Sequence, residues 1–566
     1  MDSQPGEGSV SVITKTEEQL QVSEVAQLAQ QAASPPAPID PKFLRPLFPG
    51  AGTCKATHLA ELAGAMTVPI PPEPRADLPL EGENPDIPAG YTYFGQFINH
   101  DITVPTSSIQ GAKVADADNR TPILDLDSVY GRGPGKDGYL YEVEGPDKGI
   151  KLAVATDRIT GNDIQIPHLL RGPKKPEGWE PALIGDGRND ENVIIAQIHG
   201  SFLAFHNVMV DTLRKRPGPK GNLFIRAQEE VRWHYQWLVL WDYLPLICGG
   251  SSDVRTLVDG LEADPNKVPE FKYYKQEEAF VPLEFWAAVF RFGHAMARPS
   301  YFLNNLASRP DSIDRPCHLR IPLLDFARYT DDPEKDLRGR RRIPDVWGIK
   351  WPYFFSFDRQ LRPWSEPLCE GVAVTPFDGP QKSMLIKPAI TAALSNLPDR
   401  GPQGTSSSSL AERDLILADR LGMPNGQQVA RSMGFDPISD CDLAKGVNAA
   451  ALPKALWNDT PLFYYILREA ELERGGRSLG RVGRGIVVET LIGLLWCDPT
   501  SFLRVNPGWK PWAGAIGGQP YTMAHFLSFA YGSGDWKMKY PPRGPWRDDV
   551  PAMPPDMQQM AVQQLG

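Results

Sequence analysis

The chain has 566 residues, of which 41% are apolar, 23% charged and 10% aromatic, a composition typical of a globular protein with a large core. Its 59 basic and 69 acidic side chains give a net charge of −10. This excludes an overall basic nucleic-acid-binding protein, because contact with a duplex needs clustered positive charge. The 51 glycines and 56 prolines indicate many loops and argue against a coiled coil or a long solenoid.

The two ends of the chain differ from its middle. The polar segment 1–45 ends in AASPPAPIDP and predicts a flexible N-terminal arm, and segment 541–566 predicts a Pro-rich tail, which leaves 46–540 as one large domain. The start of the chain lacks the basic and apolar regions of a Sec signal peptide. The most apolar stretches carry Asp242 and Glu489 and are too short to span a bilayer. We therefore expect a soluble protein with no transmembrane segment, either cytoplasmic or exported by a leaderless route.

The strongest patterns in the middle of the chain are helical. Segments 223–244, 285–297, 461–476 and 485–497 have apolar residues three or four apart and Gly or Pro near their ends. We find no run of alternating strands long enough for a barrel or a sandwich. The sequence therefore predicts a mainly α fold.

The first segment whose side chains could take part in catalysis or binding is YTYFGQFINHDIT (91–103). If it is helical, Gln96 and His100 are four residues apart on one face, and Asp101 points elsewhere. Polar groups in such an apolar, aromatic helix need partners, because burying them unpaired costs about 2 kcal/mol or more each.

The second segment is IGDGRNDENVIIAQIHG (184–200). Arg188 and Glu191 are three residues apart where a helix begins, so they share a face. The simplest interpretation is helix capping, since Asn189 and Asp190 are good N-cap residues.

The third segment is FWAAVFRFGHAMARPSYFLN (285–304). His294 lies in an apolar, aromatic helix with Arg291 one turn before it. A histidine in this setting could ligate a haem iron, with the arginine reaching a propionate.

Together these segments resemble the animal-type haem peroxidases, the superfamily that also contains the cyclooxygenases and the fatty-acid alpha-dioxygenases. The resemblance implies one large helical domain with haem b between a distal and a proximal helix. The order and spacing of its motifs hold from about residue 90 to residue 500. The three motifs are the distal Gln96-Phe-Ile-Asn99-His100-Asp101, the distal Arg188-Asn-Asp-Glu191 and the proximal Arg291-Phe-Gly-His294.

The resemblance assigns a role to each motif residue. His100 would be the general base and then the general acid toward hydrogen peroxide. Arg188 would stabilise charge on the departing oxygen, and Gln96 would hold water or halide beside the iron. His294 would ligate the iron, and Arg291 would reach a propionate.

The family also places an asparagine as hydrogen-bond acceptor for Nδ1 of the proximal histidine. In this chain the segment LGMPNGQQVAR gives Gln427 as the nearest match. The segment is one residue longer than the mammalian pattern, so Gln428 is the alternative.

Two departures from the mammalian pattern concern covalent links to haem. Asn99 stands where an acidic residue forms an ester, and Asn192 lacks the sulfur needed for a sulfonium link. Glu191 matches the second ester-forming carboxylate, so we expect at most one ester, through Glu191.

The resemblance further implies a calcium site. Family members use the Asp after the distal histidine together with a loop that precedes Val-Tyr-Gly, which here reads TPILDLDSVYG (121–131). Hard oxygen ligands of this kind are those that Ca²⁺ requires. The expected ligands are Asp101, Thr121, the Ile123 carbonyl, Asp125 and Asp127.

We therefore expect an enzyme that reduces hydrogen peroxide and oxidises a small phenolic, halide or pseudohalide donor. One alternative is a fatty-acid dioxygenase or hydroperoxide-processing enzyme. Arg291 argues against it, because the oxygenases have a radical-forming Tyr at that position. The other alternative is a haem-binding adhesion or scaffold protein with little turnover, against which the presence of His100 and Arg188 argues. The sequence does not predict the oligomeric state or the reducing substrate.

Overall fold

The structure is a computed structural model that describes most of the predicted domain. The described residues are 44–50, 56–70, 80–104, 121–158, 165–175, 180–216, 221–264, 267–275, 277–304, 321–324, 336–343, 347–357, 379–397, 408–445 and 452–531. The predicted tail lies outside them, and so does the predicted N-terminal arm except for its last two residues. Those two form strand β1, and Leu44 is buried in the core.

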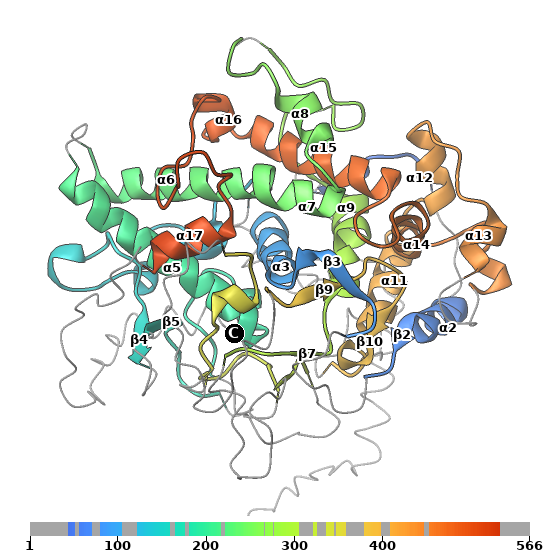
Figure 1. The fold of residues 1–566 in the computed structure, drawn as a ribbon, viewed down its shortest axis with the longest axis horizontal. Helices are drawn as coiled ribbons and strands as arrows, with labels where there is room; N and C mark the ends of the chain where they lie inside the picture. Colours follow the sequence, from blue (N-terminus) through green and yellow to red (C-terminus); the bar gives the residue numbers. More distant parts are fainter. Residues whose placement is uncertain are drawn as a thin grey trace, which may run out of the picture.

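The described part of the chain is mainly α, as predicted (Figure 1). Its α-helices are α2 (Ala56–Met66), α3 (Gly90–Ile102), α4 (Asp127–Tyr130), α5 (Val193–Lys215), α6 (Leu223–Leu238), α7 (Leu244–Cys248), α8 (Ser252–Val258), α9 (Leu283–Ala287), α10 (Gly293–Met296), α11 (Leu410–Arg420), α12 (Gly426–Ser432), α13 (Asp440–Ala444), α14 (Leu462–Arg474), α15 (Arg481–Cys497), α16 (Phe502–Val505) and α17 (Met523–Ala530).

Shorter helical turns connect these helices. The 3₁₀ turns are η3 (Gly138–Leu140), η4 (Gly145–Asp147), η5 (Gly187–Asp190), η7 (Val289–Phe292), η8 (Trp351–Tyr353), η10 (Ala392–Leu394) and η11 (Lys454–Leu456). Element η6 (Val239–Tyr243) is a π-helical turn between α6 and α7.

The strands pair only in twos within the described residues, which matches the absence of a predicted barrel or sandwich. Two pairs are parallel and three are antiparallel. The parallel pairs are β1 (Leu44–Arg45) with β6 (Val281–Pro282), and β2 (Thr67–Val68) with β10 (Ile390–Thr391). The antiparallel pairs are β3 (Glu83–Pro88) with β9 (Lys382–Met384), β4 (Ala155–Arg158) with β5 (Gln165–His168), and β7 (Ser300–Tyr301) with β8 (Ile321–Pro322).

Helix α3 lies near the middle of the molecule, with α6 and α7 running across it and α15 on their outer side (Figure 1). It packs against α5, η6 and α10. A Cβ on Gly95 would lie 2.3 Å from the Tyr243 hydroxyl, so glycine at this position allows the close approach of η6 to α3.

Helix α5 is long and apolar enough to cross a membrane by length and composition alone. However, 83% of its most apolar window is buried inside the molecule. It packs against α3, α6 and α17, as the core helix of a globular protein does.

The proximal segment differs from the continuous helix predicted over 285–297. Helix α9 ends where Ala288 leaves helical geometry (φ −138°, ψ −65°), η7 follows, and α10 comprises four residues. The aromatic and β-branched side chains of this segment, together with Gly293, have low helix propensity, which explains the break.

Candidate functional site

Two residues of α3 remain partly open to solvent. Gln96 and Asn99 are intermediate in exposure, whereas every other residue of the helix is buried. The predicted distal face of the helix is therefore the side that its neighbours leave partly uncovered. The proximal segment packs beside it, with the Thr92 hydroxyl donating to the Met296 carbonyl over 3.4 Å.

His100 is held by an amide. Its Nδ1 lies 2.8 Å from Oδ1 of Asn189, and His100 is only 5% exposed. An amide oxygen only accepts hydrogen bonds, so Nδ1 carries the proton and Nε2 carries the basic lone pair. The prediction that Asn189 caps a helix is wrong. Asp186 caps η5 and Asn192 caps α5, and the Asn189 side chain instead points inward at the distal histidine.

Arg188 lies against the last turn of α3. Its Nη2 donates to the carbonyl oxygens of His100 (2.9 Å) and Thr103 (2.6 Å), and to Asp186 (2.7 Å). Its Nη1 donates to the Thr103 hydroxyl (3.1 Å). The guanidinium therefore satisfies carbonyls at the C-terminus of the helix, and it is ion-paired with Asp186 beside the backbone of His100.

Gln96 and Glu191 meet across the distal face. Gln96 Nε2 donates to Glu191 Oε2 over 3.2 Å, and its Oε1 accepts from Asn192 Nδ2 over 3.3 Å. The structure thus brings the distal helix motif and the Arg188–Glu191 motif together, with Glu191 exposed at the edge.

The proximal histidine is bound by a carboxylate that the sequence analysis missed. Asp414 Oδ2 lies 2.5 Å from His294 Nδ1, and Asp414 Oδ1 lies 2.5 Å from Arg291 Nη1. The Asp414 side chain is fully buried, whereas those of Arg291 and His294 are 18% and 29% exposed. Burial acts to raise the pKa of the Asp414 carboxyl, but the charges and hydrogen bonds of His294 and Arg291 outweigh burial and lower that pKa below its ordinary value.

The assignment of Gln427 as the acceptor for His294 is therefore wrong. Gln427 Nε2 donates to the carbonyl of Trp457 and to the hydroxyl of Thr460, so its side chain is engaged in the turn before α14. The alternative, Gln428, bonds the backbone of Asn425 in a capping box at the start of α12.

Arg291 is also placed differently from the sequence expectation. It contacts Asp414 through Nη1 and the carbonyl of Trp286 through Nε (3.1 Å). These contacts make it the partner of the carboxylate behind His294, and the contact with a propionate stays a prediction.

The expected calcium ligands gather around an acidic cluster. Carboxylate oxygens of Asp101, Asp125 and Asp127 all lie within 4.8 Å of one another. The Thr121 hydroxyl donates to Asp125 Oδ2 over 2.8 Å, which places this residue beside the cluster. Ile123 lies in the same loop, and the role of its carbonyl stays a prediction.

The acidic loop is tied to the distal helix. Asp101 accepts from the amide of Leu126 and the hydroxyl of Ser128, each over 3.2 Å. Leu126 adopts a left-handed conformation (φ 61°), which is uncommon for a residue other than glycine. Burial raises the pKa of the Asp125 carboxyl, while Arg232 and the Thr121 hydroxyl act to lower it. Three carboxylates so close together repel one another, which is the setting that a divalent cation stabilises.

The residues of α10 fit an approach of haem to His294. His294 and Gly293 are partly exposed, and a Cβ added to Gly293 would meet no heavy atom within 4 Å. His294 is the candidate ligand, because an imidazole with Nδ1 bound to a carboxylate presents Nε2 to a metal.

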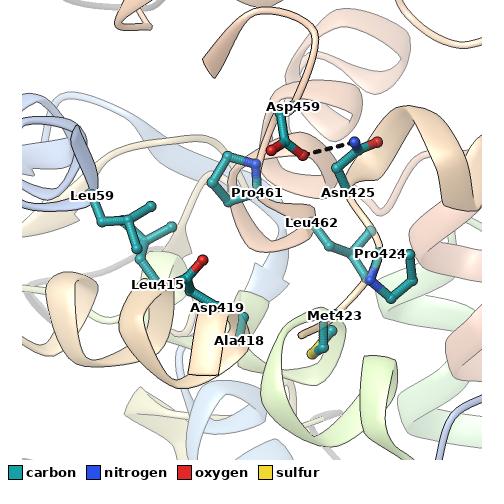
Figure 2. Close-up of a pocket in the computed structure, with 10 residues that line it drawn as sticks. All are labelled: Leu59, Leu415, Ala418, Asp419, Met423, Pro424, Asn425, Asp459, Pro461 and Leu462. Atoms are coloured by element: carbon teal, nitrogen blue, oxygen red, sulfur yellow. Dashed lines mark hydrogen bonds between the residues drawn. The ribbon is translucent and has the colours of Figure 1, made fainter. Parts of the chain in front are cut away.

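A separate small pocket lies between α2, α11 and the start of α14 (Figure 2). Its walls are mostly apolar, and its polar end is closed by a 2.8 Å hydrogen bond from Asn425 Nδ2 to Asp459 Oδ1. None of its lining residues belongs to the three motifs or to the acidic cluster, so it is not part of the candidate site.

Comparisons with known proteins agree with this arrangement. Residues 110–323 match the family model described as animal haem peroxidase, a range that includes the acidic loop, Arg188 and His294 but begins after His100. Over 124 residues the chain is 29% identical to dual oxidase of Drosophila melanogaster, a match that covers 21% of this chain and only 7% of that protein's length.

Among solved structures, peroxidase A from Dictyostelium discoideum is 14% identical, with a TM-score of 0.50 over 85% of this chain and 90% of that chain. A fatty acid alpha-dioxygenase from Arabidopsis thaliana is 11% identical, with a TM-score of 0.48 over 86% of this chain and 75% of that chain. At such low identity the likeness to the Dictyostelium peroxidase establishes the fold. The family-model match over residues 110–323 lies within a chain of that fold, so this segment is similar to the animal haem peroxidases.

Proposed function

We propose that the protein is a haem peroxidase that reduces hydrogen peroxide and oxidises a small phenolic, halide or pseudohalide donor. The observation that carries the proposal is the state of His100, a buried histidine whose Nδ1 is bound by Asn189, so that its basic nitrogen is Nε2. On the neighbouring proximal segment, a second histidine is bound through Nδ1 by a buried carboxylate.

His294 would hold the haem iron, and the bound haem would supply the redox chemistry that takes up the oxidising equivalents of peroxide. His100 Nε2 would take the proton from the nearer peroxide oxygen and return it to the departing one. The positive charge of Arg188 would stabilise negative charge on that oxygen. Gln96 would hold water or halide on the open face of α3.

The alternative of fatty-acid oxygenation is not favoured by the proximal segment. Arg291 stands three residues before His294, at the position of the oxygenases' radical-forming tyrosine, and it is bound to a buried carboxylate. A guanidinium does not form the radical that hydrogen abstraction from a fatty acid needs.

The test is a comparison of substrates on the haem-loaded chain. A panel of phenols, iodide and thiocyanate with hydrogen peroxide should give donor oxidation well above that of free haem at equal concentration. Consumption of dioxygen with a long-chain fatty acid, without donor oxidation, would favour the dioxygenase alternative. Haem binding without either activity would favour the scaffold alternative.

We propose that Asp101, Thr121, the Ile123 carbonyl, Asp125 and Asp127 bind a structural Ca²⁺. Asp125→Ala should lose the ion and about 3 kcal/mol of stability at a calcium concentration a hundredfold above the Kd. The Soret spectrum should also change, because Asp101 directly follows His100.

Elemental analysis measures the calcium content of each chain. Thermal melts and Soret spectra before and after chelation measure the changes in stability and in the haem environment. The control is Asp211→Ala, which removes a half-exposed carboxylate from α5 and should leave the calcium content unchanged. A wild type that contains no calcium would contradict the proposal, as would an Asp125→Ala variant with unchanged melting temperature and Soret spectrum.

The charge of Asp414 should lower the reduction potential of a His294-bound iron. Asp414→Asn keeps an acceptor oxygen but removes the charge, and a charged acceptor makes a hydrogen bond roughly twice as strong. We expect the Fe(III)/Fe(II) midpoint to rise by roughly 60 mV, the equivalent of a tenfold change for one electron.

A spectroelectrochemical titration measures this midpoint. Asp419→Asn is the matched control, since it makes the same change on α11 at a partly exposed position. An unchanged midpoint in Asp414→Asn would show that the carboxylate does not act on the iron.

We also propose that any covalent link to haem is a single ester through Glu191. The carboxylate lies at the open edge of the distal face, and the Asn99 amide cannot form such an ester. Denaturing mass spectrometry after peroxide treatment should find an adduct in the wild type and none in Glu191→Gln. An adduct that persists in the variant would place the link elsewhere.

A further inference from the structure

Asn189 joins the distal histidine to a second buried histidine. Its Oδ1 lies 2.8 Å from His100 Nδ1, and its Nδ2 lies 3.1 Å from His199 Nδ1. Asn189 and His199 have no exposed surface, and His100 has 5%. The three residues belong to η5, α5 and α3, so one amide connects the three elements that form the distal side.

The chemistry of the amide determines the state of both rings. Nδ2 only donates hydrogen bonds and Oδ1 only accepts them. His199 Nδ1 is therefore the acceptor, and His100 Nδ1 carries the proton. A neutral imidazole exchanges between two tautomers, and the hydrogen bond at one nitrogen decides which of them is populated. The orientation of the Asn189 amide thus selects the tautomer of His100 whose Nε2 has the lone pair.

His199 supplies the reason for that orientation. A reversed amide would turn its NH₂ toward His100 and its oxygen toward His199, which would require both rings to change tautomer. His199 is held in the core at the first turns of α5, with its ring edge-on to Phe97 of α3 at 6.1 Å. In the tautomer whose Nδ1 is an acceptor, His199 binds the donor end of the amide, and Oδ1 then faces His100.

We infer that Asn189 is a positioning residue that holds His100 in the tautomer with a basic Nε2, and that His199 positions Asn189 by accepting its NH₂ group. The inference rests on the proposed function, in which His100 Nε2 moves the peroxide proton. It predicts that both residues act on the reaction only through His100.

A double-mutant cycle tests this dependence. Asn189→Leu is similar in size and removes the acceptor, so the second-order rate of the peroxide-induced Soret change should fall about 10- to 100-fold, part of the effect expected of acid–base catalysis. In the His100→Ala background the same substitution should change the rate less than about twofold, because the imidazole that Asn189 positions is absent.

A second variant covers the case in which Asn189→Leu does not fold. His199→Phe keeps a ring against Phe97 but removes the acceptor for the amide, and it should slow the reaction about 3- to 10-fold in the wild type and not in His100→Ala. The control is Asn207→Leu, which removes a different side-chain amide, on α5. That amide makes two hydrogen bonds of 2.8 Å with the backbone of Leu152. It should leave the rate unchanged.

Equal slowing in both backgrounds would overturn the inference and make Asn189 a packing residue. So would an unchanged rate for a folded Asn189→Leu chain. If His100→Ala itself reacts as fast as the wild type, the proposed function fails. If His100→Ala reacts slowly with peroxide but Asn189→Leu and His199→Phe react as fast as the wild type, the proposed function stands. Only the positioning role of Asn189 and His199 then fails.

Discussion

His294→Ala should lose haem. In the structure Nδ1 of His294 is bound to Asp414, so that Nε2 is the nitrogen available to iron. Changes in residues that merely support a ligand typically cost 10- to 100-fold in metal affinity, so loss of the ligand itself should cost more than about 100-fold. The haem content per chain, from the pyridine haemochrome assay, should therefore fall from about one to near zero.

The control for this variant is His58→Ala, which removes a partly exposed histidine from α2 and should retain haem. Addition of imidazole should partly restore haem binding to His294→Ala, because imidazole can occupy the space of the lost ring. Full haem occupancy with an unchanged spectrum in His294→Ala would show that another residue ligates the iron.

His100→Ala should bind haem normally but react with hydrogen peroxide about 10²- to 10⁴-fold more slowly. This is the usual contribution of general acid–base catalysis to a rate. The rate should fall because His100 would be the proton acceptor. His100 is buried on α3, and the hydrogen bond of its Nδ1 with Asn189 makes Nε2 the basic nitrogen. Stopped-flow measurement of the Soret change against peroxide concentration gives the second-order rate constant.

His58→Ala should react as the wild type does, which controls for the general loss of a histidine. An unchanged rate in a folded, haem-loaded His100→Ala chain would mean that His100 is structural and that proton transfer occurs elsewhere.

Much of the helical architecture could be predicted from the sequence, because it follows from local periodicity. Helices α6, α14 and α15 appear where apolar residues recur at helical spacing. The break of the proximal segment could not be predicted from periodicity. Residues 285–297 keep that spacing, but low-propensity side chains and the contacts of Arg291 and His294 with Asp414 favour short turns over a continuous helix.

The site was predictable where its residues lie close together in the chain. The acidic loop and the three motifs depend on short spacings, and the structure brings Asp101 to Asp125 and Gln96 to Glu191. Asp414 lies 120 residues from His294, so only tertiary packing joins them. One signal was present in the sequence: Asp414 is an acidic residue on the apolar face of the amphipathic segment 410–420, where a carboxylate needs a partner.

Asn189 was missed for a different reason. Its position before a helix fits a capping residue as well as it fits an inward-pointing amide, and sequence alone does not distinguish the two. Its side chain points inward because Asn192 already satisfies the first amides of α5.

We propose that the haem-loaded chain uses hydrogen peroxide through His100 and His294. Rapid-scan absorption spectroscopy during the addition of one equivalent of peroxide tests it most directly. We expect a concentration-dependent Soret change far faster than that of free haem, and recovery of the starting spectrum when a phenol or iodide is added. A Soret band that is unchanged by peroxide, or that only bleaches at the rate of free haem and does not recover with a donor, would contradict it.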